Sequence, residues 1–238
     1  MTTQKSTVDE IRQRFDAEAE LYTNLETGQV SAVDSTLAMS LVAEAAAATT
    51  LHATELLEVG CGGGNYTLKL LERLPSLNVT LIDLSQTMLD LAVPRVRSRA
   101  KGVVQAVRSD IRHLDLGKGK FDIVLASAML HHLRTDDEWR AVFQMLHDVL
   151  RPRGSLWIFD IVESPLPEVQ AIHWRRYGDY LAAAGGDAYR EELFARIIAE
   201  DTPRSVPYQL DLLRAVGFQE VELLHKNTCY AAFGGIKR

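Results

Sequence analysis

Apolar residues follow two different spacings along this chain, and the spacings predict which segments are helices and which are strands. Apolar residues three or four positions apart predict helices over residues 8–21, 65–74, 136–150 and 206–216. Short runs rich in valine, isoleucine and leucine predict strands over residues 55–59, 78–83, 103–107, 121–126, 155–161, 221–224 and 229–236. Strands and helices that take turns within 238 residues fit one α/β domain with additions.

Before the first strand the chain carries two helical patterns. Ile11, Phe15 and Ala19 recur at four-residue intervals among polar residues, which predicts an amphipathic helix. A second helix is expected through the alanine run 45–48, because alanine favours helix, with Ser35 or Ser40 as its N-cap. This second helix would bring the chain to the first strand.

The first strand runs into a glycine-rich turn, which is the strongest signal in the sequence. Glu58 lies two positions before Gly60, and residues 60–64 read GCGGG, with Cys61 between glycines. Glycines let a ligand approach bare backbone, and the start of the following helix adds free N–H groups and a partial positive charge. The dinucleotide pattern G-x-G-x-x-G would need glycine where Asn65 stands. The order is instead acid-x-G-x-G-x-G.

This turn resembles the first motif of the class I S-adenosylmethionine (SAM)-dependent methyltransferases. SAM has no phosphate but carries a cationic sulfonium and an ammonium, so an acid beside the turn suits SAM and would repel a pyrophosphate. Other stretches are similar to motifs of the small-molecule members of that family: residues 15–22 (FDAEAELY), 83–89 (DLSQTML), 109–111 (SDI), 121–124 (FDIV), 130–133 (LHHL), 150–160 (LRPRGSLWIFD) and 215–218 (AVGF). Arg153 stands where the family often has glycine, which loosens that turn. The resemblance covers about residues 55–236.

The resemblance implies a Rossmann-like α/β fold with a seven-stranded sheet, mostly parallel with an antiparallel last strand, and helices on both faces. It also implies a SAM site. Asp83 ends the second strand, 23 residues after Gly60, where an acid can bind a ribose diol, although a dinucleotide offers the same ribose. Ser85 is expected to cap the next helix, Asp110 to accept from the adenine amine, and Ile111 to cover the ring. The expected cofactor-binding residues are Tyr22, Glu58, Gly60, Cys61, Gly62, Asp83, Leu84, Met88, Asp110, Ile111 and Ala126.

Two segments are expected to meet the methyl acceptor. His131 and His132 follow the fourth strand, at the edge of the sheet where open α/β folds bind ligands. One of them could act as a general base, because histidine titrates near neutrality; alternatively His132 bonds backbone and His131 only lines the pocket. Within a single domain over residues 1–238, residues 1–50 are expected to form lid helices. Residues 163–203 are expected to form a substrate-recognition insertion, interrupted at Gly185-Gly186. The expected substrate contacts are Tyr22, His131, His173, Arg176 and Tyr177.

Composition narrows the partners and the compartment. The net charge is −6 and the pI is about 5.7, which argues against a nucleic-acid partner because phosphate binding needs a basic face. Two cysteines make no disulfide framework, and no residue group has zinc-ligand spacing, so no metal is expected. The charged N-terminus is unlike a signal peptide, and no apolar run is long enough to span a membrane. We therefore expect a cytoplasmic protein, monomeric or homodimeric.

The sequence thus predicts transfer of a methyl group from SAM to a small-molecule acceptor, which leaves S-adenosylhomocysteine. Because that leaving group is neutral, placing the acceptor about 3 Å from the methyl carbon is expected to supply most of the catalysis. Three alternatives stay open. One is a tRNA-modifying enzyme that uses SAM or carboxy-SAM, because residues 189–237 are loosely similar to such enzymes. The others are a non-catalytic SAM-binding protein of the same fold and an NAD-dependent oxidoreductase, which Glu58 and Asn65 oppose.

Overall fold

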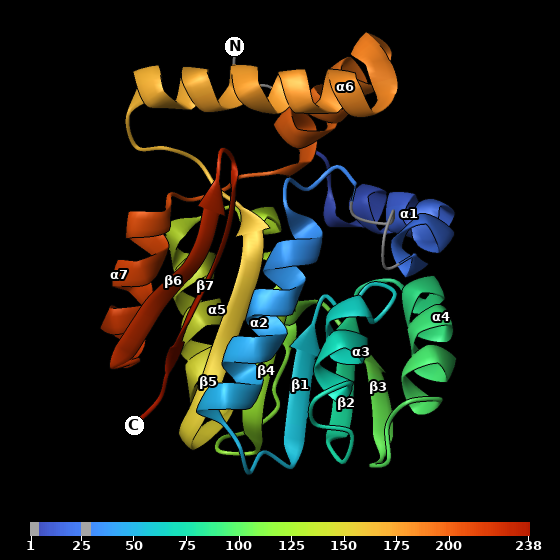
Figure 1. Ribbon diagram of the computed structural model, residues 1–238, viewed down its shortest axis with the longest axis vertical. Coiled ribbons are helices and arrows are strands. Elements are labelled where there is room, and N and C mark those ends of the chain that lie inside the picture. Colours follow the sequence, from blue (N-terminus) through green and yellow to red (C-terminus); the bar gives the residue numbers. More distant parts are fainter. Residues whose placement is uncertain (1–4, 25–29) are drawn as a thin grey trace.

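The computed structural model describes residues 5–24 and 30–238, and a seven-stranded sheet lies at the centre of these residues (Figure 1). The strands stand in the order β3-β2-β1-β4-β5-β7-β6, and neighbouring strands are parallel except where β7 pairs with β5 and β6. The expected Rossmann-like sheet with an antiparallel last strand is therefore confirmed. The strands are β1 (Glu55–Val59), β2 (Asn78–Asp83), β3 (Val104–Arg108), β4 (Phe121–Ser127), β5 (Leu150–Ile161), β6 (Glu220–Asn227) and β7 (Tyr230–Ile236).

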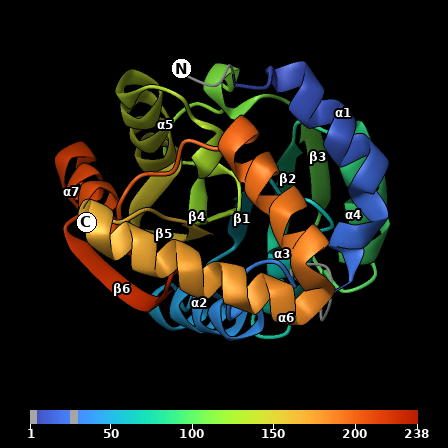
Figure 2. The same ribbon diagram turned by 90° about the horizontal axis from the view of Figure 1, so that it is seen from above.

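Helices cover both faces of the sheet (Figure 2). They are α2 (Ser35–Thr49), α3 (Asn65–Leu71), α4 (Gln86–Arg97), α5 (Asp136–Val149) and α7 (Val206–Val216). Helices α2, α3 and α4 pack on one face, and α5 and α7 pack on the other. Because side chains alternate across a strand, Leu56 packs with the first set and its neighbour Leu57 with the second. Both leucines are fully buried, as expected for a strand that is covered on two sides.

A third group of segments lies across the carboxyl ends of the parallel strands (Figures 1 and 2). The group consists of α1 (Val8–Glu18), the 3-10 turns η1 (Ala19–Thr23), η2 (Ile111–His113) and η3 (Leu130–His132), and the long helix α6 (Pro167–Glu200). Helix α6 makes up most of the insertion expected over residues 163–203. It bends at Gly186, where a φ of 85° and a ψ of 176° leave the helical region and favour glycine. The expected interruption at Gly185-Gly186 is confirmed.

The start of α2 differs from the expectation. Neither Ser35 nor Ser40 caps this helix, because it begins directly after Asp34, which has a left-handed φ of 57°. The Asp34 carboxylate does not cap it either, since it accepts from His225 and Asn227 of β6 at 2.9 and 2.8 Å. A contact with a strand far along the sequence therefore fixes the start of α2, and local capping chemistry does not.

Other element boundaries lie close to the expected ones. The Ser85 hydroxyl accepts from the Met88 N–H at 3.0 Å, so Ser85 caps α4 as expected. Helix α3 ends before residue 74. Strand β5 begins earlier than residue 155, because Leu150 already pairs with Phe121 of β4. The ladder then shifts its register around Arg153, which adopts a left-handed φ of 68° where glycine would be unstrained.

The segment expected to form lid helices divides into two parts with different positions. Helix α1 and η1 lie over the strand ends, whereas α2 packs its apolar face against the sheet. Residues 1–4 and 25–29 of the expected lid lie outside the described residues. Among the helices in the described part of the chain, none is both long and apolar enough to cross a membrane.

Candidate active site

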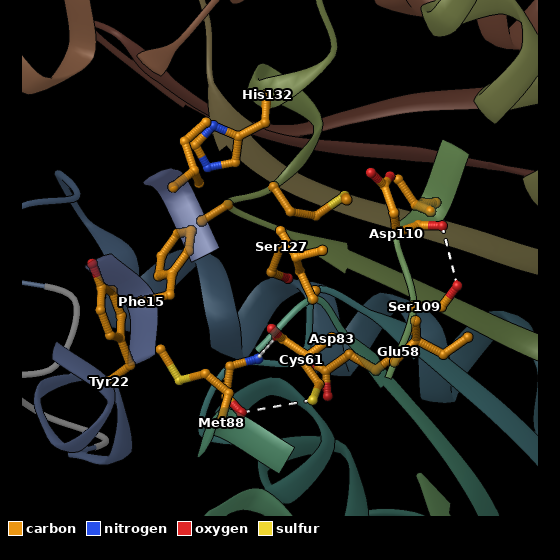
Figure 3. Close-up of a pocket in the computed structure, with 18 of the residues that line it drawn as sticks. Phe15, Tyr22, Glu58, Cys61, Asp83, Met88, Ser109, Asp110, Ser127 and His132 are labelled. Carbon is orange, nitrogen blue, oxygen red and sulfur yellow. Dashed lines mark hydrogen bonds between the residues drawn. The ribbon is translucent and has the colours of Figure 1, made fainter. Parts of the chain in front are cut away.

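A pocket lies at the carboxyl ends of β1, β2 and β4, with α1 and η1 forming one of its walls (Figure 3). Most of the expected cofactor-binding residues line it: Tyr22, Glu58, Gly60, Cys61, Gly62, Asp83, Leu84, Met88, Asp110 and Ile111. Ala126 does not, because its side chain is buried within β4. The fold therefore brings η1 together with the ends of β1, β2 and β3, whose expected cofactor-binding residues stand up to 89 positions apart in the sequence, from Tyr22 to Ile111.

The glycine turn supplies a floor of backbone for this pocket. Gly60 and Gly62 have positive φ angles of 64° and 49°, which favour glycine. A Cβ on Gly60 would stand 2.7 Å from the Met129 side chain, so a larger residue would collide with the wall beside it. A Cβ on Gly62 would meet no atom within 4 Å, which leaves that side of the turn open to a ligand.

Gly63 has a different role, because it lets η1 lie directly on the turn. A Cβ on Gly63 would stand 2.5 Å from the Tyr22 carbonyl oxygen. The Asn65 side-chain amide donates to the same carbonyl at 3.0 Å. The Arg95 guanidinium donates to the carbonyls of Gly63 and Thr23. These polar contacts therefore hold η1 against the glycine turn.

Asp83 stands at the end of β2 with both carboxylate oxygens fixed by backbone. Gly62 N–H donates to Oδ2 at 2.8 Å, and Ser85 N–H donates to Oδ1 at 2.9 Å. Burial raises the pKa of Asp83, although these N–H groups oppose the shift. Asp83 lines the pocket, and a carboxylate has more lone pairs than these backbone donors occupy, so it can accept a hydrogen bond from a ligand.

Glu58 is almost completely buried beneath the turn, at 1% exposure. Its carboxylate accepts from the Thr67 hydroxyl and from the Thr67 N–H at 3.2 Å, so it satisfies a donor in the first turn of α3. Burial outweighs these bonds and raises the pKa of Glu58 to about 8. In the absence of a cation, this acid therefore stays mostly protonated at neutral pH.

Asp110 and Ile111 follow β3 and line the pocket together. Arg112 donates to both carboxylate oxygens of Asp110, from Nη2 to Oδ2 at 2.6 Å and from Nε to Oδ1 at 2.9 Å. Burial opposes ionisation of Asp110, but the hydrogen bonds and charge of Arg112 outweigh it and hold the pKa of that carboxyl below its ordinary value. Ile111 is buried and presents an apolar surface beside the carboxylate.

Helix α1 brings aromatic rings to the pocket. Phe15 lies between Tyr22 and His132, with ring centroids 5.6 and 5.8 Å away and edge-to-face geometry (Figure 3). The helix is tied to the end of α6 by Arg14, which donates to both carboxylate oxygens of Glu200 at 2.8 and 2.5 Å. Helix α1 and the end of α6 are therefore bonded directly to each other.

The two adjacent histidines have different environments. His131 is turned away from the pocket: its Nδ1 bonds the Asp160 carboxylate, and its Nε2 lies 3.7 Å from Asp201 Oδ1. Burial disfavours the imidazolium, but Asp160 and Asp201 outweigh it and raise the pKa of His131 to about 9. His132 is the histidine that lines the pocket. Burial and the charge of His131 hold the pKa of His132 well below its ordinary value. The sequence offered, as one interpretation, His131 as the ring that lines the pocket and His132 as the ring that bonds backbone. The structure has the reverse, because His132 lines the pocket and His131 bonds Asp160.

The insertion residues expected to contact substrate do not line this pocket. Tyr177 is fully buried in an aromatic cluster between α6 and β7. Its hydroxyl donates to the Ser31 carbonyl at 2.9 Å and lies 3.3 Å from the Tyr230 hydroxyl. His173 and Arg176 lie on the same helix, outside the lining residues. Their assignment to substrate stays a prediction.

Several pocket residues were missed by sequence reasoning: Phe15, Gly63, Ser127, Met129 and Arg134. Phe15 and Met129 belong to or adjoin motifs that the family resemblance had located, so these two had a signal. Gly63 stands in the glycine turn that the sequence located, but neither its contact with η1 nor the role of Arg134 had a signal, because both depend on which distant segment lies against them.

Comparison with known proteins agrees with this geometry. The sequence pattern of the methyltransferase domain family matches residues 56–154. A demethylmenaquinone methyltransferase from Lactococcus lactis is 26% identical over 176 residues, which cover 72% of this chain and 68% of the relative. The demethylmenaquinone methyltransferase from Lactobacillus johnsonii is 30% identical over 123 residues, or 51% of this chain. The match spans about half of that relative's length, 49%.

The architecture also recurs among solved structures. The 1,6-didemethyltoxoflavin-N1-methyltransferase of Burkholderia thailandensis, solved with bound 1,6-didemethyltoxoflavin and S-adenosylhomocysteine, matches with a TM-score of 0.62 and 20% identity. That match covers 100% of this chain and 93% of the other, and it shows the shared fold. The matched sequence pattern, the strand order and the acid-flanked glycine turn lead to one conclusion: residues 56–154 belong to a methyltransferase domain of the class I SAM-dependent type.

Proposed function

We propose that this protein binds SAM in the pocket beneath α1 and transfers the methyl group to a small-molecule acceptor in the same pocket. The observation that carries the proposal is that one pocket joins the glycine turn, the Asp83 and Asp110 carboxylates and the His132 ring (Figure 3). A cofactor on the turn and an acceptor near His132 would therefore share one space, which in-line transfer requires.

The cofactor would be held along the three strand ends. The Asp83 carboxylate, fixed by two backbone N–H groups, would accept from the ribose diol. Asp110 would accept from the adenine amine while Ile111 and Met88 enclose the ring, and all three line the pocket. The methionine portion would lie on the glycine turn above Glu58. A bound ammonium nearby would favour the ionised form of that acid.

The acceptor is proposed to be small and largely apolar. Val8, Ile11, Phe15, Met129 and Leu133 line the pocket and offer an apolar surface. The relatives described above carry the names of methyltransferases for demethylmenaquinone and 1,6-didemethyltoxoflavin, which are small molecules. The net charge of −6 opposes a nucleic-acid acceptor.

Catalysis would consist mainly of positioning, because the sulfonium is already activated and its leaving group is neutral. A base is needed only where the acceptor enters as a protonated hydroxyl or amine. His132 is the histidine on the pocket wall, and its lowered pKa keeps it in the neutral form that can accept a proton. His131 would support the wall from behind through its bond to Asp160.

The test is calorimetric titration of ligand-free protein with SAM, S-adenosylhomocysteine and NAD, beside Asp83→Ala. We expect micromolar SAM binding, no NAD binding, and at least a tenfold weaker SAM affinity in the variant. Asp90→Ala, which removes an exposed carboxylate from the same part of the chain, is the matched control. Failure of both SAM-type ligands to bind would overturn the proposal. SAM binding without methyl transfer to a broad panel of acceptors would instead support a non-catalytic SAM-binding protein.

A further inference from the structure

Three side chains, one on the pocket wall and two behind it, face one another closely. His131 and His132 come from η3, and Asp201 directly follows the last residue of α6. His131 Nε2 lies 3.7 Å from Asp201 Oδ1, and His132 Nδ1 lies 3.4 Å from the same oxygen. One ligand atom from each of the three residues lies within 4.8 Å of the others. Donor atoms around a tetrahedral zinc ion, with bonds of about 2.1 Å, stand about 3.4 Å apart.

Asp160 orients His131 as the outer partner of a metal ligand would. Its carboxylate bonds His131 Nδ1 and also accepts the His131 backbone N–H at 3.1 Å. These two bonds fix the ring and leave Nε2 turned toward Asp201. Metal-bound histidines usually donate their second ring N–H to a carboxylate, a backbone carbonyl or water. The Thr202 N–H also donates to the His131 carbonyl at 2.7 Å, which holds the segment carrying Asp201 beside η3.

His132 adds an independent observation. Both of its ring nitrogens are buried, and neither has a partner with hydrogen-bond geometry among the described residues. The nearby polar groups are the Asp201 carboxylate and the Glu200 backbone. A buried imidazole usually has a partner for its acceptor nitrogen, and an ion between His132 and Asp201 would supply one.

The negative charges around the cluster exceed the positive charges of the side chains that bond it, which favours binding of a cation. Asp160 and Asp201 are both buried carboxylates. The cationic side chains nearby are engaged elsewhere: Arg14 with the Glu200 carboxylate, Arg134 with the Glu200 carbonyl, and Lys5 with the carbonyls of Ile198 and Asp201. The competing occupant of the gap is a proton, because an imidazolium at His131 would also satisfy Asp160 and Asp201.

We propose that His131, His132 and Asp201 form a binding site for one divalent transition-metal ion of the zinc class. Two imidazole nitrogens and one carboxylate oxygen suit Zn²⁺, Co²⁺ or Ni²⁺, whereas Mg²⁺ prefers oxygen ligands throughout. The ion would join the end of α6 to η3, and so fix the wall that carries His132. The proposal concerns metal binding alone and does not depend on methyl transfer. An ion on His132 Nδ1 would leave Nε2 protonated, so His132 would then position the acceptor and not act as its base.

The experiment is titration of the untagged full chain, stripped with a chelator, with Zn²⁺ by calorimetry and with Co²⁺ by visible absorption. We expect one ion per chain, a tetrahedral Co²⁺ spectrum, and no comparable response to Mg²⁺. His132→Gln and Asp201→Asn should each weaken binding at least 100-fold, and Asp160→Asn by about 10–100-fold. His225→Gln is the matched control, because it removes a histidine that pairs with one carboxylate, Asp34, at 2.9 Å.

Thermal unfolding and SAM titration of each variant separate loss of the site from loss of the fold. Absence of saturable Zn²⁺ binding to folded wild-type protein would overturn the proposal and leave His131 as an imidazolium between carboxylates. Binding that persists unchanged in Asp201→Asn would overturn it too. SAM binding to the same preparation tests the proposed function by itself, so the two proposals can fail separately.

Discussion

The two sides of the pocket are built in different ways. The cofactor side consists of residues 58–65, 83–88 and 109–111, three short stretches at the ends of strands. Short-range bonds hold two of them, and the bond from Gly62 N–H to Asp83 joins the first to the second. The cover consists of α1, η1, η3 and the end of α6, and contacts between segments far apart in sequence hold it together, such as Arg14 with Glu200. The first side depends on local chain chemistry and the second on tertiary contacts, so they should respond differently to mutation.

The largest effect is expected at Gly63, where the two sides meet. In Gly63→Ala the new Cβ would stand 2.5 Å from the Tyr22 carbonyl and 2.9 Å from Thr23 Cα, so backbone must move. We expect a loss of about 3 kcal/mol in the free energy of unfolding and at least tenfold weaker SAM binding, measured by urea denaturation and calorimetry. Gly119→Ala is the comparison, because a Cβ there meets nothing within 4 Å, and only its positive φ of 61°, which Gly63 does not share, resists the substitution. Equal losses in the two variants would mean that η1 does not depend on this contact.

The next effect concerns the tie between α1 and α6. Arg14 and Glu200 are both largely buried, with side-chain exposures of 18% and 10%. A double-mutant cycle with Arg14→Gln and Glu200→Gln should give a coupling free energy of about 2 kcal/mol, since the hydrogen bonds are charge-assisted and partly shielded from water. Amide hydrogen exchange in α1 should rise in both variants. The exposed Arg12–Asp9 pair on the same helix should show no measurable coupling. Coupling near zero at Arg14 would mean that the cover is held by its apolar contacts.

A smaller effect is expected at the bend of α6. Gly186 adopts backbone angles that other residues rarely reach, although a Cβ there would meet no atom within 4 Å. Gly186→Ala should therefore lower the free energy of unfolding by about 1.5 kcal/mol through backbone strain. SAM affinity should not change, because Gly186 lies in α6 and does not line the pocket. A parallel loss of SAM binding would show that the two sides are coupled through α6.

The most gradual effect is a pH dependence that arises beneath the glycine turn. The folded-state pKa of Glu58 is raised to about 8 from an ordinary value of 4.5, so the folded protein holds a proton that the unfolded chain has released. This group's stabilising contribution is therefore full below pH 4.5 and is lost progressively between pH 4.5 and 8. In Glu58→Gln that loss should disappear. The free energy of unfolding of the variant relative to wild type should rise by about 1 kcal/mol per pH unit from pH 5 to 7.

Urea denaturation at pH 5, 6 and 7, without SAM, measures this difference and cancels the other titrating groups. A constant difference between variant and wild type would show that Glu58 is ionised beneath the turn. Glu58 would then be ionised before SAM binds, as the sequence analysis assumed when it paired this acid with the cationic groups of SAM.

Much of the cofactor side could be predicted from the sequence. The acid-flanked glycines located the turn, Asp83 marked the end of β2, and Ser85 was correctly assigned as the cap of α4. These features are readable because glycine dihedrals, helix caps and strand alternation depend on residues a few positions apart. The same local rules failed at α2, where Asp34 bonds β6 instead of its own helix.

The cover was predictable only in outline. The sequence indicated that aromatic and polar residues of the insertion meet the substrate, yet Tyr177 of α6 is buried against Tyr230 of β7. It placed His131 and His132 together at the sheet edge, but which ring faces the pocket depends on Asp160 and Asp201. Such choices depend on burial and charge contributed by distant segments, and sequence spacing does not reveal these.

The sequence alone therefore determined the order of strands and helices, the glycine turn with its neighbouring acid, and the methyltransferase domain that contains it. Those features follow from local periodicity and from the conformational freedom of glycine, which each short segment carries in itself. The tertiary structure decided that Glu58 is buried, that Gly63 receives η1, and that Asp201 lies beside two histidines. Those features arise only when segments far apart in the chain exclude water from one another, because burial sets both the charge state and the direction of each side chain.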